Sequence, residues 1–139
     1  MPAEFIDSNV FVYLFDKTQT HKKERARSII EQGIRNGDAI ISFQVVQEVL
    51  NVITHKMTVP VTDGDAVAFL DSVLMPMCRV YPSDQLYRQA LDLKQRFRYG
   101  FFDSLILASA MESGCTRVIT EDMQHGQRIG NLLIFDPFQ

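Results

Sequence analysis

Four acidic residues occupy positions at which side chains commonly take part in chemistry. Asp7 and Asp122 each come at the end of a short apolar segment, and Asp103 stands at the head of the most apolar stretch of the chain. Glu48 lies within an amphipathic segment, on the border of its apolar face. Ordinary surface acids are scattered over the outer faces of helices, so this combination of positions draws attention to the four residues as a set.

Carboxylates that gather in one place raise one another's pKa, and a bound cation offsets that repulsion. Oxygen ligands without histidine or thiolate suit Mg²⁺ or Mn²⁺. Such a site supports phosphoryl transfer, because the metal lowers the pKa of a bound water, orients it and offsets charge on the phosphate. Ser8, Asn9 and Thr120 are polar neighbours that could hold waters or fix a carboxylate rotamer; turn and strand-end hydrogen bonding explains each of them equally well.

Each acid also has an ordinary structural explanation. Asp103 would make a good helix N-cap, a role worth about 0.5–2 kcal/mol. Asp7 and Asp122 are typical turn residues after strands, and Glu48 can reach solvent past the valines beside it. These explanations are stronger for any one residue alone, and the combination of the four favours a metal site.

The composition excludes several classes of protein. The 139 residues are typical of one domain, which we place at 1–139, and 14 Lys and Arg against 17 Asp and Glu give a net charge of −3. This balance argues against nucleic-acid binding by bulk positive charge, although not against binding at a local site. No apolar run approaches the ~20 residues of a membrane span, and we expect no signal peptide.

The cysteines and histidines show no metal-ligand spacing. Cys78 and Cys115 lie far apart, so we expect buried thiols in a reducing compartment, the cytoplasm. The three histidines lack any zinc-site spacing.

Apolar patterning predicts strands that alternate with helices. The predicted strands are 5–6, 39–41, 78–81, 117–120 and 132–135. The predicted helices are 10–15, 20–35, 42–56, 62–74, 83–97 and one that begins at Asp103. This alternation indicates an α/β sandwich with a mostly parallel sheet, in which sites form at the carboxyl ends of strands. Asp7 and Asp122 should therefore lie at the same edge of the sheet.

A segment rich in arginine and aromatic residues leads directly into Asp103. Arg96 and Arg98 lie here, and Phe102 is the residue before the aspartate. Arginine binds phosphate through two hydrogen bonds and aromatic rings stack on unpaired bases, so Arg96 or Arg98 is expected to contact substrate phosphate. Burial in the core explains the phenylalanines of this segment equally well.

Four short motifs in this order resemble the PIN-domain family, small metal-dependent ribonucleases that include the VapC toxins of bacterial toxin–antitoxin pairs. The motifs are Phe5–Asn9, Val46–Val49, Phe102–Ala110 and Ile119–Asp122, and the resemblance covers the whole chain. The stretch Glu121–Gly126 also resembles a signature of one bacterial PIN subgroup.

The resemblance implies a PIN-like three-layer α/β/α sandwich with a mostly parallel central sheet. It implies an acidic pocket for Mg²⁺ or Mn²⁺ made by Asp7, Glu48, Asp103 and Asp122, and it leaves open whether Glu121 or Asp122 is the fourth acid. Ser8 and Thr120 match supporting hydroxyls of the family, and Asn9 matches a common residue after the first aspartate. An RNA substrate, a small antitoxin partner and a homodimer are further implications.

The leading functional hypothesis is a toxin endoribonuclease that hydrolyses RNA with an activated water and no covalent intermediate. A catalytically weak PIN-like protein that binds RNA or a protein partner is the alternative, and the intact set of four acids counts against it. A phosphatase or a receiver domain is a third class. The receiver pattern fits badly, because Asp7 is followed by Ser8 and Asn9 and no lysine lies beyond Lys94.

Overall fold

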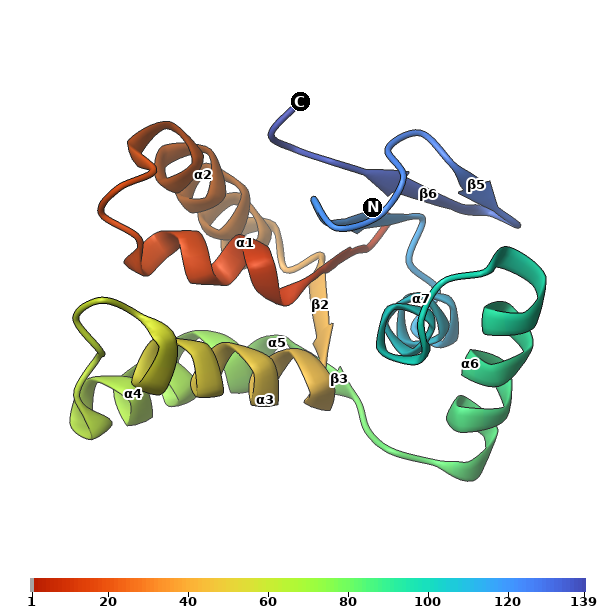
Figure 1. The fold of residues 1–139 in the computed structure, drawn as a ribbon, viewed down its shortest axis with the longest axis horizontal. Coiled ribbons are helices and arrows are strands. Elements are labelled where there is room, and N and C mark those ends of the chain that lie inside the picture. Colours follow the sequence, from red (N-terminus) through yellow and green to blue (C-terminus); the bar gives the residue numbers. More distant parts are fainter. Residues whose placement is uncertain (1) are drawn as a thin grey trace.

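A computed structural model describes residues 2–139 and contains one six-stranded sheet with helices on both sides (Figure 1). The strand order across the sheet is β3-β2-β1-β4-β6-β5. The strands are β1 (Glu4–Ile6), β2 (Ala39–Ser42), β3 (Cys78–Val80), β4 (Arg117–Ile119), β5 (Arg128–Ile129) and β6 (Leu132–Phe135). The PIN-like sandwich expected from the sequence is thereby confirmed.

The helices agree with the apolar spacing to within a few residues at most ends. They are α1 (Ser8–Val12), α2 (Thr20–Asn36), α3 (Phe43–Asn51), α4 (Asp63–Phe69), α5 (Met75–Met77), α6 (Asp84–Phe97) and α7 (Phe101–Glu112). A 3-10 turn, Tyr13–Phe15, extends α1, and π-helical turns over Val52–Lys56 and Leu70–Leu74 extend α3 and α4. In Figure 1, α1 and α2 lie on one side of the sheet, and α6 and α7 lie on the other.

The sheet is parallel except at one edge. β1 pairs in parallel with β2 and β4, β2 with β3, and β4 with β6, whereas β5 pairs antiparallel with β6. β5 was not predicted from the sequence, because a two-residue strand is too short to show any periodicity. Gly130, at a left-handed φ of 60°, begins the tight turn that joins β5 to β6.

The central helix α7 is the most apolar element and is buried over most of its length. Ser104 to Ala110 are all buried, as expected for a helix that is apolar nearly all round. One expectation was wrong: the helix begins at Phe101 rather than at Asp103, and Gly100 is its N-cap. Asp103 therefore lies within the first turn, where a carboxylate interacts favourably with the helix dipole, and its side chain does not cap the helix.

Two other observations bear on the expectations from composition. Cys78 and Cys115 are both buried and free, as expected. No helix within residues 2–139 is long and apolar enough to cross a membrane.

Gly33 lets α2 approach the first residue of β2. A Cβ at this position would lie 2.6 Å from the Cβ of Ala39, well inside van der Waals contact. Alanine normally stabilises a helix interior by about 0.5–1 kcal/mol over glycine. Here the clash with a rigid methyl group opposes that gain, so the close packing of α2 on the sheet requires glycine.

We predict that Gly33→Ala lowers the free energy of unfolding by about 1–3 kcal/mol, the usual cost of overpacking. Gly64→Ala is the matched control, because a Cβ on Gly64 of α4 meets no atom within 4 Å. Urea denaturation should show the control to be unchanged or more stable. Equal effects of the two substitutions would contradict this account of the α2–β2 contact.

Candidate functional site

Asp7 lies at the carboxyl end of β1, beside the end of β4. The two strands run in register, with Ile6 opposite Ile119, and the Asp7 N–H donates to the Ile119 carbonyl at 3.0 Å. The Asp7 carboxylate accepts hydrogen bonds from the Ser8 backbone N–H at 2.7 Å and from the Thr120 hydroxyl at 2.8 Å. Adjacent parallel strands therefore fix this carboxylate at the edge of the sheet, as the sequence pattern predicted.

Burial sets the protonation of this carboxylate. Asp7 is only 4% exposed, and its pKa is raised from 3.8 to about 7, with burial as the largest cause. The nearby charges of Glu48 and Asp122 contribute to this rise, while the hydrogen bonds from Thr120 and Ser8 oppose it. The fold thus holds a carboxylate among like charges in a position that disfavours its ionised form.

The Asn9 side chain links the ends of β1 and β4. Its amide nitrogen lies 3.0 Å from Asp122 Oδ2, 3.1 Å from Thr120 Oγ1 and 3.5 Å from Asp7 Oδ2. The Thr120 hydroxyl also accepts from the Asp122 N–H at 3.2 Å. Asn9 and Thr120 therefore orient two acids with respect to each other.

Asp122 and the adjacent Glu121 point to different surroundings. The charge of Asp122 raises the pKa of Asp103, for which burial is the larger cause, and it also acts on Asp7. Glu121 instead accepts hydrogen bonds from the Tyr13 hydroxyl and, at 3.0 Å, from Lys22 Nζ. This geometry favours Asp122 over Glu121 as the acid near Asp7 and Asp103, a choice that the sequence left open.

Gln44 joins the helices that carry Glu48 and Asp103. It is 3% exposed, and its amide nitrogen lies 3.1 Å from the Phe102 carbonyl and 3.4 Å from Glu48 Oε2. The sequence analysis did not select Gln44. Its position one helical turn before Glu48, on the same face, was the available signal.

Three buried polar atoms have no hydrogen-bond partner among the described residues: Ser42 Oγ, Gln44 Oε1 and Ser104 Oγ. They lie at the start of α3 and in the first turn of α7, the elements that carry Glu48 and Asp103. Buried polar groups are nearly always satisfied in folded proteins, so each of these atoms has room in its hydrogen bonding for a polar ligand.

Tyr99 ties together the loops that precede Asp103 and follow Asp122. Its hydroxyl lies 2.5 Å from Gln127 Oε1 and accepts from the Gln124 N–H at 3.2 Å. His125 Nδ1 accepts from the Asp136 N–H at 2.9 Å, which gives this exposed residue a structural role. The stretch after Asp122 is therefore a turn held from two sides.

The donor set suits a hard divalent cation, although the acids do not form a closed cage. Every candidate ligand is a carboxylate, hydroxyl or amide oxygen, as Mg²⁺ and Mn²⁺ prefer. Within residues 2–139, no group of three or more acids, histidines or cysteines stands ready to hold a metal. Mg²⁺ commonly binds through one or two carboxylates and keeps several waters, so neighbouring acids suffice for it.

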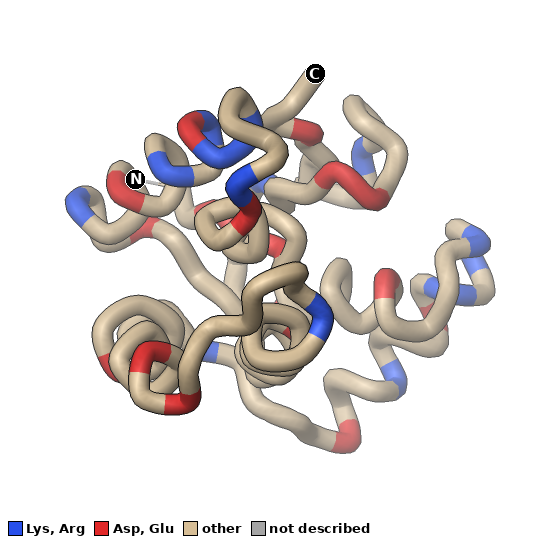
Figure 2. The backbone as a smooth tube through the Cα atoms, turned by 60° about the vertical axis from the view of Figure 1, so that its left-hand side comes forward, with Lys and Arg blue, Asp and Glu red and all other residues tan. Residues whose placement is uncertain are grey.

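The two arginines proposed to contact substrate lie in different settings. Arg96 is exposed, forms an ion pair with Asp92 at 3.1 Å and lies over the ring of Phe97. Arg98 is exposed and ends α6 with a left-handed φ of 67°, a conformation usual for glycine. It makes no ion pair with the described residues. Basic positions elsewhere are spread over several segments (Figure 2).

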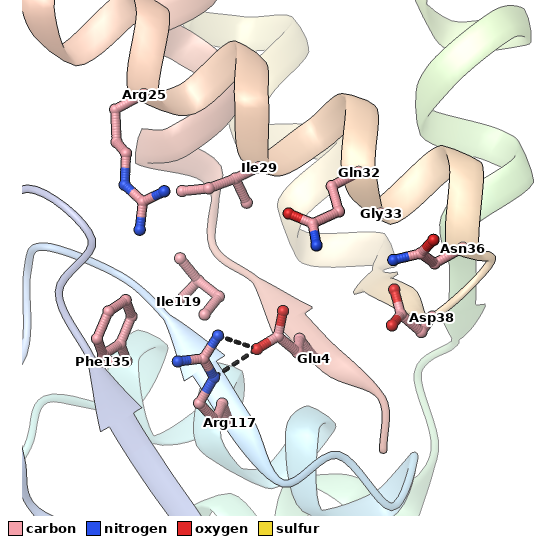
Figure 3. Close-up of a pocket in the computed structure, with 10 residues that line it drawn as sticks. All are labelled: Glu4, Arg25, Ile29, Gln32, Gly33, Asn36, Asp38, Arg117, Ile119 and Phe135. Atoms are coloured by element: carbon pink, nitrogen blue, oxygen red, sulfur yellow. Dashed lines mark hydrogen bonds and ion pairs between the residues drawn. The ribbon is translucent and has the colours of Figure 1, made fainter. Parts of the chain in front are cut away.

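A separate polar pocket lies between α2 and the sheet and contains none of the four acids (Figure 3). Its charged groups are largely engaged within the protein: Arg117 forms an ion pair with Glu4, and Arg25 Nε donates to the Pro137 carbonyl at 3.1 Å. These contacts are typical of structural polar packing.

We predict that Asp7 makes the metal-free protein less stable as pH rises. Between about pH 4 and pH 7 the unfolded chain ionises at Asp7 while the folded protein retains the proton, so up to ~4 kcal/mol of stability is lost over that window. Asp7→Asn removes this loss. It should therefore be more stable than the parent by a few kcal/mol at pH 8 and by much less at pH 4.

Urea denaturation in EDTA at both pH values measures this difference. Two results would contradict the raised pKa of Asp7. One is a gain in the free energy of unfolding from Asp7→Asn that is equal at pH 4 and pH 8, and the other is a variant less stable than the parent at pH 8.

Comparison with known proteins supplies the family. A PIN domain model matches residues 5–128, while no curated protein sequence matches. Solved structures with a similar fold include a toxin–antitoxin complex from Klebsiella pneumoniae (TM-score 0.69, 16% identity, 97% of this chain and 98% of that chain). Another is VapBC-1 from nontypeable Haemophilus influenzae (TM-score 0.63, 19% identity, 99% of this chain and 99% of that chain).

A third similar structure is VapC20 of Mycobacterium tuberculosis, a toxin that cleaves the sarcin-ricin loop (TM-score 0.60, 18% identity, 84% of this chain and 87% of that chain). At these identities the solved structures establish likeness of fold alone. The family model, in contrast, covers most of the chain, together with the sheet edge at which Asp7, Asn9, Thr120 and Asp122 meet. The chain belongs to the PIN domain family.

Proposed function

We propose that this protein is a metal-dependent endoribonuclease that hydrolyses RNA phosphodiester bonds. The observation that carries the proposal is the buried Asp7 carboxylate, held by Ser8 and Thr120 beside Glu48 and Asp122. Placing a carboxylate where burial and like charges disfavour its ionisation reduces stability, and such arrangements are characteristic of functional sites. The similarity of fold to toxin–antitoxin proteins agrees with the proposal.

Asp7, Asp103 and Asp122 are the residues that would hold Mg²⁺ or Mn²⁺, with Glu48 beside them. When bound, the cation would lower the pKa of a coordinated water and offset charge on the phosphate. Asn9 and Thr120 would keep the carboxylates of Asp7 and Asp122 in place through the hydrogen bonds described above. We assign no serine or cysteine nucleophile, so water is the attacking group.

The biological role that fits best is the toxin of a type II toxin–antitoxin pair acting in the cytoplasm. Structures of related fold are complexes of toxin with antitoxin, including VapBC2 of Rickettsia felis bound to promoter DNA. We therefore propose an antitoxin protein as partner, and a homodimer as the assembly.

A catalytically weak PIN protein that binds RNA or a protein is the second candidate. The observation in its favour is that the acids of residues 2–139 do not form a ready group of three metal ligands. Metal binding and cleavage separate the two candidates.

We predict that the purified protein cleaves structured RNA in Mg²⁺ or Mn²⁺, and that EDTA abolishes cleavage. Asp7→Asn should lower the cleavage rate by more than about 100-fold, because loss of even a residue that supports a metal ligand costs ~10–100-fold. Asp122→Asn should have a similar effect, whereas Glu121→Gln, its matched neighbour, should retain most activity. Gel analysis of end-labelled RNA measures all three.

Cleavage that survives both EDTA and Asp7→Asn would refute the metal site. If no RNA is cleaved and Mn²⁺ leaves the melting temperature unchanged, the binding role is favoured instead.

We predict further that Arg98→Gly weakens RNA binding while preserving the fold. Glycine relieves the left-handed backbone strain at this position, worth about 1 kcal/mol, so the variant should be at least as stable as the parent. Loss of one phosphate contact should reduce the slope of log affinity against log salt by ~0.7 for a single strand. An unchanged slope and affinity would remove Arg98 from the substrate site.

A further inference from the structure

Phe102 is the exposed phenylalanine of the chain. Of the ten phenylalanines, nine are buried or half-buried, whereas the Phe102 side chain is 65% exposed. The sequence pattern left open whether the aromatics before Asp103 belong to the core. The structure shows that Phe102 is not part of the core. The exposure of its ring therefore requires another explanation.

The backbone that carries the Phe102 ring is fixed by its helix and by a hydrogen bond. Phe102 lies in the first turn of α7, and its carbonyl accepts the hydrogen bond from the buried Gln44. Its ring packs edge-to-face against Phe101, with centroids 5.4 Å apart and planes at 72°, and Phe101 packs against the core. A ring supported in this way loses little conformational entropy when a ligand covers its exposed side.

Phe102 lies close in sequence to one of the four acids and to an exposed cationic side chain. Asp103 is the next residue, and Gln44, which contacts the Phe102 carbonyl, also reaches Glu48. Arg98, four residues earlier, is exposed and makes no ion pair with the described part of the chain. An exposed guanidinium and an exposed aromatic ring thus precede Asp103 within a short stretch of the chain.

We propose that Phe102 is a stacking subsite for an unpaired RNA base next to the phosphate that is cleaved. Base–aromatic stacking is worth about 1–3 kcal/mol per base and is the usual way in which proteins hold single-stranded RNA. The proposal rests on the function proposed above and adds to it a preference for RNA that is unpaired at the cleavage site.

The surroundings of the ring favour a base over a protein side chain as its ligand. The interface core for a protein partner is a continuous apolar patch. Here the residues that lead into Phe102 include the exposed Arg98 and Gly100, and the half-buried Asp103 follows it. An exposed aromatic ring that follows an exposed cation and precedes an acid in the sequence matches a nucleotide, which combines a π-face with a phosphate.

Binding of a fluorescein-labelled 20-nucleotide single-stranded RNA of mixed sequence tests the proposal. The parent protein carries Asp7→Asn to prevent cleavage, and fluorescence anisotropy gives the dissociation constant. Phe102→Ala and Phe102→Leu should each weaken binding about 5- to 100-fold, because leucine is apolar but has no π-face. Phe102→Trp should bind within about threefold of the parent.

Salt and duplex controls separate stacking from charge. The salt slope should not change in the Phe102 variants, because stacking releases no counterions. The same sequence as a duplex should show little effect of Phe102→Ala, since its bases are already stacked. Ile34→Ala, which removes an apolar side chain 53% exposed near the end of α2, should bind like the parent, and all variants should melt within a few degrees of it.

Equal affinity of the parent, Phe102→Ala and Phe102→Leu would overturn the proposal, as would an equal loss in the duplex or no binding of the single strand by the parent. If the Phe102 ring contacts a protein partner instead, the parent and both variants should bind the RNA with equal affinity. The outcome is distinguishable from failure of the nuclease proposal: a protein without metal-dependent cleavage can still lose single-strand affinity when Phe102 is replaced.

Discussion

The contact on which the site depends is the pairing of β1 with β4 at their carboxyl ends. Because Ile6 and Ile119 are in register, Asp7 and Thr120 emerge side by side, and the Thr120 hydroxyl donates to Asp7 at 2.8 Å. Asp7 is buried at this edge next to other acids, and burial is the main reason that its pKa rises to about 7, against the lowering effect of the Thr120 hydrogen bond. A divalent cation bound there would offset the unfavourable charge. The buried Asp7 carboxylate therefore relates the fold to its stability and to the proposed chemistry.

The segments that carry the other acids are joined by polar cross-links, most of them between elements that are distant in sequence. Gln44 connects α3 to the start of α7, and Tyr99 connects the loop before α7 to the turn after Asp122. Tyr13 and Lys22 bind the Glu121 carboxylate, while the Asn9 amide contacts the Asp122 carboxylate. Rigid support of this kind is what a site needs if its ligands are to keep their geometry, because small displacements of a catalytic group cost much of its effect.

Much of this arrangement could be predicted from the sequence, for identifiable reasons. Strands and helices that alternate force a parallel sheet, so the placement of Asp7 and the end of β4 at one edge followed from topology. The start of α7 at Phe101 could not be predicted, since Gly100 caps through its backbone conformation alone. The choice between Glu121 and Asp122 depends on Tyr13 and Lys22, which are about 100 residues away in the chain. Tyr99, and Gln44 in its contact with the Phe102 carbonyl, were missed for the same reason: these contacts are long-range in sequence.

The claim that the acids hold a divalent cation is tested most directly by anomalous diffraction from crystals soaked in Mn²⁺. We predict a manganese peak at the carboxyl ends of β1 and β4, within direct coordination distance of an Asp7 oxygen and of an oxygen of Asp103 or Asp122. The peak should vanish in Asp7→Asn crystals. A parent crystal with no peak at this position, or with manganese bound only elsewhere, would contradict the account.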